Sequence, residues 1–86
     1  MPELCRFYGI VIRMYFNDHA PAHFHAEYSG DEAVISIETP SVLGGRLPPR
    51  AQGLVMEWAL LRRLQLRQAW QKAQRLESPG KIAPLE

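Results

Sequence analysis

Residues 18–28 of the chain read Asp-His-Ala-Pro-Ala-His-Phe-His-Ala-Glu-Tyr, and they contain all three of its histidines. The imidazole of histidine titrates near neutrality, and its neutral ring is a common metal ligand. Packing in the core of a small domain does not explain three imidazoles within a span of seven residues. We therefore expect any chemistry of this protein to be carried out by this stretch.

The same stretch predicts a strand with two different faces. Pro21 disfavours helix at this point and favours extended backbone before it. Because strand side chains alternate, a strand over residues 23–28 places His23, His25 and Glu27 on one face. The other face carries the apolar set Phe24, Ala26 and Tyr28. We expect the apolar set to be buried and the two imidazoles to line a solvent-accessible cleft.

The spacing of the histidines allows two kinds of site. Same-face neighbours on a strand lie about 6.5 Å apart, so His23 and His25 are able to chelate one ion or contact one substrate group. His19, in the preceding loop, is the third candidate ligand, and the cofactor is either none or a divalent metal such as zinc. Glu27 lies about 13 Å from His23 by the same rise and suits an electrostatic role. Asp18 or Glu27 would orient an imidazole ring by a hydrogen bond to the nitrogen that does not bind the metal. A solvated histidine surface is the alternative without function.

The remaining residues predict strands followed by helices. Apolar and β-branched residues predict a strand over about 6–16, and alternation predicts another over 32–38, after a turn at Ser29–Asp31. Residues 42–47 form either a fourth short strand or a flexible loop. We therefore expect one α+β domain over residues 1–86, with a small antiparallel sheet of three or four strands.

The sheet is expected to pack against the C-terminal part of the chain. Apolar residues at helical spacing predict a helical region over about 49–76, which begins at two prolines. Arg62 interrupts the apolar stripe of this region, so we expect either a kinked helix or a helix pair. Residues 81–86 are expected to dock as an extended tail.

Composition limits the possible partners. The chain has 86 residues. Its formal net charge of +1 is too small to attract nucleic acid strongly by long-range electrostatics. A chain of this size buries only about 60–65% of its unfolded surface, so a homodimer or a complex with another protein is expected. The single cysteine, Cys5, excludes an internal disulfide. Without a signal peptide or a long apolar segment, a cytoplasmic location and no membrane association are expected.

Several segments together resemble a known family. They are residues 1–3, 7–14, 18–28, 46–48, 57–59 and 82–85, and the most specific is the pattern His-x-Pro-x-His-Phe-His-Ala that begins at His19. These segments resemble the small bacterial proteins grouped as domain of unknown function 4160, over essentially the whole chain. Members are often encoded beside a small partner. The resemblance therefore implies the toxin of a type II toxin–antitoxin pair, with a neighbour-encoded antitoxin-like partner, but it implies no established reaction.

Three functions remain open from the sequence. A toxin that acts on RNA would use two of the histidines as acid and base, with Glu27 assisting. Its phosphate-binding candidates are Arg13, Arg46 and Arg50. The second function is a metal-binding module or metal-dependent hydrolase that uses His19, His23 and His25. The third is a non-enzymatic module that binds a partner protein, so whether the chain is an enzyme stays open.

Overall fold

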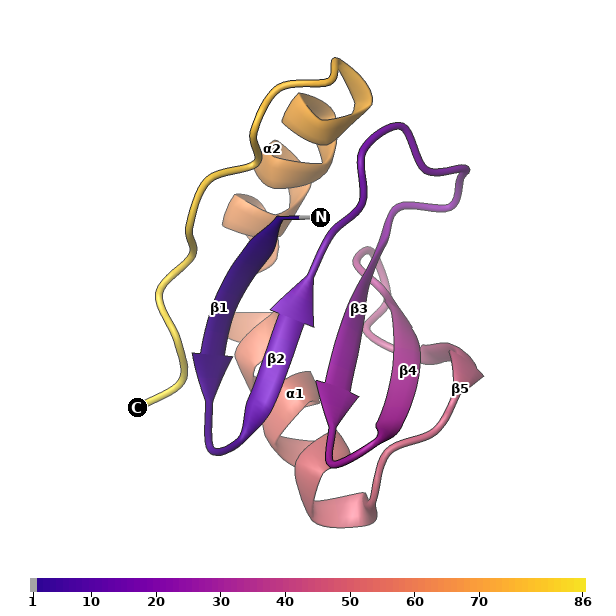
Figure 1. The fold of residues 1–86 in the computed structure, drawn as a ribbon, viewed down its shortest axis with the longest axis vertical. Coiled ribbons are helices and arrows are strands. Elements are labelled where there is room, and N and C mark those ends of the chain that lie inside the picture. The colour runs from indigo at the N-terminus through magenta and orange to yellow at the C-terminus, as the bar shows by residue number, and fades with distance from the viewer. Residues whose placement is uncertain (1) are drawn as a thin grey trace.

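The structure is a computed structural model that describes residues 2–86. Within these residues, five strands form one antiparallel sheet in chain order, and two helices follow. The strands are β1 (Glu3–Phe7), β2 (Ile10–Arg13), β3 (His23–Tyr28), β4 (Asp31–Ser36) and β5 (Val42–Gly45). The helices are α1 (Pro49–Leu61) and α2 (Arg63–Gln74). Figure 1 shows α1 crossing behind the sheet. The predicted α+β class is confirmed, although the sheet has five strands where three or four were expected.

The single strand predicted over residues 6–16 is a hairpin in the structure. Phe7 pairs with Ile10, so that Tyr8 and Gly9 form a two-residue turn. Both turn residues have positive φ, 51° at Tyr8 and 80° at Gly9, as a type I′ turn requires. The extra strand makes β1 an edge of the sheet and places β2 beside β3. The predicted turn between β3 and β4 is present at Ser29 and Gly30.

The face of the sheet that the helices cover contains the hydrophobic core. Phe24 of β3 is fully buried, and its ring meets that of Trp58 of α1 edge-on at 5.6 Å. Burial of each large apolar side chain contributes about 1.5–3 kcal/mol to folding. Ala26 of β3 is also fully buried on this face, and the neighbouring strands add Ile10, Ile12, Ala33 and Ile35. The predicted alternation of β3 is therefore confirmed.

The helical region is a helix pair. Pro49 occupies the first turn of α1, and Arg62 separates the helices with φ −110° and ψ 21°. The side chain of Arg62 donates to the carbonyl of Ala83 at 3.2 Å, which explains how an arginine fits the apolar stripe. The tail also accepts a hydrogen bond from the Trp58 indole at the same carbonyl, 2.8 Å away. In Figure 1 this extended tail runs beside β1.

Two surface features complete the fold. Leu60, Leu61 and Leu64 are exposed around the junction of the two helices. No helix within residues 2–86 has both the length and the apolar character that a membrane crossing requires.

Candidate metal centre

His23, the first residue of β3, has an acceptor at each ring nitrogen. Its Nδ1 lies 2.7 Å from the carbonyl oxygen of Pro21, and because a carbonyl only accepts, Nδ1 carries a proton and donates it. Its Nε2 lies 2.9 Å from Oδ2 of Asp18. A neutral imidazole has only one N–H, so the contact with Asp18 requires a second proton or a metal ion at Nε2.

His25, two residues further along the same face, has one occupied and one free nitrogen. Its Nδ1 lies 2.9 Å from Oε2 of Glu32 on β4 and donates to that carboxylate. Its Nε2 is buried, has no hydrogen-bond partner among the described residues and lies 3.7 Å from Oδ2 of Asp18. The ring of Tyr15 packs over the imidazole at 4.3 Å. The Nε2 atom of His25 therefore lies near the same carboxylate that contacts His23.

Asp18, His23 and His25 together form a potential metal centre. Each offers one ligand atom, and these atoms lie within 4.8 Å of one another. Two ligands at 2.0–2.1 Å from a tetrahedral ion lie about 3.4 Å apart, so only small movements are needed to enclose an ion. Both Nδ1–H groups are held by oxygen acceptors, as is usual for histidines that bind a metal through Nε2.

The carboxylate of Asp18 is charged and fixed in place. Burial raises the pKa of Asp18, but hydrogen bonds from the His19 backbone N–H and the His23 ring outweigh this effect and hold the pKa below its usual value. The loop that carries Asp18 is tied to α2, since Gln74 donates to the Asp18 carbonyl at 2.9 Å. The backbone N–H of Asn17 also donates to a carbonyl of α2, that of Ala73.

The residues that surround His23 and His25 in the structure are not the ones that the sequence predicted. The His19 side chain is 90% exposed, and its Nδ1 lies 3.1 Å from Oδ1 of Asp18, so Asp18 takes the place predicted for His19. Glu27 pairs with Arg13 at 3.2 Å and is not one of the clustered residues. Glu32 supports His25 instead, which the sequence did not predict.

The two imidazoles line one cavity, as predicted, but they are less exposed than expected. The side chain of His23 is 7% exposed and that of His25 is 13% exposed. The rings do lie on the face opposite Phe24, but the loop with Asp18 folds back against them, and Trp70 of α2 lies 5.2 Å from the His23 ring. Their exposure was not predictable, because strand alternation gives the face of a residue and does not show which other segments cover that face.

A cavity of about 390 Å³ adjoins the cluster. The two histidines, Asp18 and the loop over residues 19–21 form one side of it. Val34 of β4 with Leu43 and Gly44 of β5 form another part of the wall. The volume is in the range of small-ligand sites.

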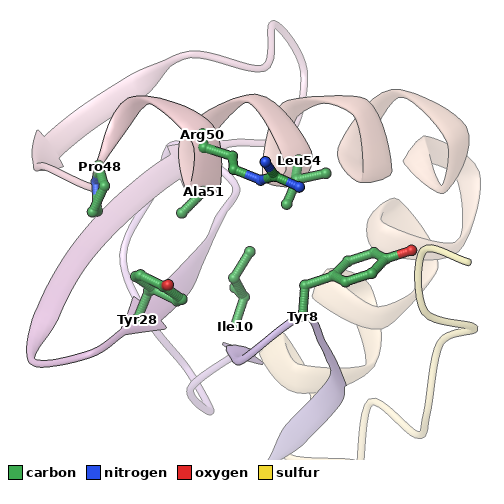
Figure 2. A pocket seen from close by; sticks show the side chains of 7 residues that line it. All are labelled: Tyr8, Ile10, Tyr28, Pro48, Arg50, Ala51 and Leu54. Atoms are coloured by element: carbon green, nitrogen blue, oxygen red, sulfur yellow. The ribbon is translucent and has the colours of Figure 1, made fainter.

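The predicted phosphate-binding arginines are not gathered at this cavity. Arg13 lies opposite His25 in the β2–β3 ladder, but its guanidinium pairs with Glu27. Arg46 follows β5 and is not among the residues that line the cavity. Arg50 lies in a separate cavity of about 110 Å³, where Figure 2 shows it on the same side as Leu54, across from Tyr28. Tyr28 ends β3, whereas His23 begins that strand, so the two cavities lie toward opposite ends of the strand.

The fold and the cluster define a small α+β domain with a centre of two histidines and one carboxylate. The chain belongs to the family described as domain of unknown function DUF4160, which matches residues 9–71. That segment contains Asp18, His23, His25 and Glu32. No curated protein and no solved structure matches the chain.

Proposed function

We propose that this protein binds a divalent transition-metal ion through Asp18, His23 and His25 and is a metal-dependent hydrolase. The observation that carries the proposal is the convergence of two Nε2 atoms on one carboxylate, with both Nδ1–H groups already held by other acceptors. Imidazole nitrogens favour zinc or a similar transition metal, whereas magnesium and calcium favour sites made of oxygen ligands.

Hydrolysis is favoured over a purely structural role by the number of ligands. Structural zinc sites have four protein ligands, whereas catalytic sites have three and leave a position for water. Three donors are clustered here, and a cavity that can admit a substrate lies beside them. When bound, the ion would lower the pKa of a water ligand to near neutrality.

The alternative of metal-free RNA cleavage by two histidines has less support. An acid and a base must each present a nitrogen to the substrate. Both nitrogens of His23 face protein oxygens, and Nε2 of His25 is buried. Among the described residues that line the cavity there is also no lysine or arginine to hold a phosphate.

The cellular role is proposed to be that of the toxin in a type II toxin–antitoxin pair, as the resemblance implies. The exposed leucines Leu60, Leu61 and Leu64 offer a surface for the neighbour-encoded partner or for a second copy. Expression should arrest growth, co-expression of the neighbour should relieve the arrest, and Asp18→Asn should abolish it. Arrest by the Asp18→Asn variant at equal protein level would show that the metal centre is not the toxic element.

The metal proposal is tested by titrating the purified full-length chain with zinc and by elemental analysis after dialysis. We expect one ion per chain, and a loss of affinity of well over tenfold in Asp18→Asn, His23→Ala and His25→Ala, because a lost ligand should cost at least as much as the 10–100-fold typical of a lost supporting group. His19→Ala is the matched control, because it removes a histidine from the same loop but leaves all three donors. Unchanged affinity in the three donor variants, with circular dichroism showing that they fold, would refute the site.

A further inference from the structure

The cavity beside the metal centre is polar on one side and apolar on another. The polar side is formed by Asp18 and the histidines, and the apolar part of the wall comes from Val34 and Leu43. Leu43 is 49% exposed and lies in β5, the strand at the edge of the sheet. A substrate whose reacting group approaches the metal centre therefore has its attached group beside aliphatic side chains.

The charges around the centre cancel once a divalent ion is bound. The ion brings two positive charges, and Asp18 and Glu32, the two carboxylates that contact the histidines, bring two negative charges. The nearest guanidinium in the strand ladder, that of Arg13, is paired with Glu27 at 3.2 Å. Sites for phosphodiesters and nucleic acids instead supply excess positive charge from lysine and arginine.

We infer, on the basis of the proposed metal-dependent hydrolysis, that the substrate is a neutral acyl compound, an ester or amide with a short apolar group, and not a phosphodiester. The carbonyl would lie at the metal centre and the apolar group against Leu43 and Val34. The oxygen of water forms a bond to the carbonyl carbon, the bond from that carbon to the leaving oxygen or nitrogen breaks, and the proton from water ends on the leaving group. The products are a carboxylic acid and an alcohol or amine, and no oxidant or reductant is needed.

The test uses the zinc-loaded full-length chain, whose metal content is measured first. Its substrates are p-nitrophenyl butyrate, which is neutral, and bis(p-nitrophenyl) phosphate and a short RNA, which are anionic. We expect zinc-dependent hydrolysis of the ester and none of the two phosphodiesters. Cleavage of either phosphodiester, or an intact ester despite bound zinc, would overturn the inference and leave the metal site standing. Absence of zinc would overturn both.

A charge placed in the apolar wall separates the two substrate classes further. Leu43→Lys should lower kcat/KM for the ester about tenfold, because it replaces an apolar contact by a charged group. Leu76→Lys is the matched control, since Leu76 is 70% exposed and lies outside the cavity, and it should leave the rate unchanged. If Leu43→Lys leaves ester hydrolysis intact, the apolar wall does not bind the substrate and the inference is overturned. An increase in cleavage of bis(p-nitrophenyl) phosphate would support it, because the described residues that line the parent cavity include no lysine or arginine and the new lysine supplies that positive charge.

Discussion

Glu32 contacts a histidine of the proposed metal centre without contributing a ligand atom to it. Its carboxylate accepts the Nδ1 proton of His25 at 2.9 Å, and this contact holds the ring with Nε2 3.7 Å from Oδ2 of Asp18. A carboxylate behind a metal-bound imidazole also makes the ring a stronger donor. If His25 had no role in metal binding, the charge of Glu32 would have no effect on zinc affinity.

We therefore predict that Glu32→Gln weakens zinc binding by about 10–100-fold, the usual cost of losing such a supporting group. The amide keeps the size of the side chain but removes its charge. A competition titration with a zinc-binding dye measures the change. Glu27→Gln is the control, because it makes the same substitution on the same face at a residue paired with Arg13. Equal affinities in both variants would show that Glu32 does not support the centre.

Cys5 is a potentially reactive side chain that its surroundings make unreactive. The residue is buried in β1, and burial raises the pKa of the Cys5 thiol to about 11. Because the thiolate is the reactive form, a disulfide reagent should not label the native protein at about pH 8. Labelling should become complete in concentrated guanidinium chloride. Rapid labelling of the native protein would mean that β1 opens easily at the sheet edge.

Among the strands and helices, the sequence predicted which face of a strand is buried better than it predicted the turns between strands. Alternation from His23 to Tyr28 correctly placed Phe24 in the core, because period-two spacing does not depend on the rest of the fold. The β1–β2 turn was missed because its first residue is Tyr8, an aromatic residue within an apolar run. Its φ of 51° is unusual for such a residue, and turn prediction relies on residues that favour this conformation.

The composition of the site was predictable only in part for the same reason. The two histidines are neighbours on one strand, so their proximity follows from local geometry. Glu32 reaches His25 only because β3 and β4 pair with His25 opposite Val34, two residues from Glu32 on the same face. Asp18 comes into contact with His23 only because its loop folds back against the strand. Register and loop closure depend on tertiary packing, which a single sequence does not reveal.

Gly45, the last residue of β5, links the edge strand to the centre. It has a φ of 69°, and a Cβ at this position would overlap the carbonyl oxygen of Glu32. The next residue, Arg46, donates its backbone N–H to that same carbonyl at 3.0 Å. The backbone of Glu32 is therefore positioned by the close approach of β5.

We predict that Gly45→Ala destabilises the protein by about 2–4 kcal/mol, from the left-handed backbone and the overlap together. Thermal unfolding monitored by circular dichroism measures this loss. Gly44→Ala is the matched control, since a Cβ there meets no atom within 4 Å, and it should unfold close to the parent. Similar midpoints for the two variants would show that the end of β5 yields to the added methyl group.

Across the whole molecule, the residues of the proposed metal centre come from three successive segments of the chain. Asp18 belongs to the loop after β2, His23 and His25 to β3, and Glu32 to β4. The second helix contacts the same region through Gln74, which donates to the carbonyl of Asp18. An ion at this point would hold the loop, two strands and a helix together, so its binding should be visible in global stability.

We predict that zinc raises the melting temperature of the whole domain. A ligand at one hundred times its Kd stabilises the native state by about 2.7 kcal/mol. For a domain of this size, that corresponds to an increase in Tm of about 10–20 °C. A chelator should reverse the increase, and the melting temperature of Asp18→Asn should respond far less to zinc, because this variant lacks one of the three ligands. If the Asp18→Asn variant shows the same increase, zinc is binding elsewhere, because loss of the carboxylate that both imidazoles face should weaken binding at this centre by well over tenfold.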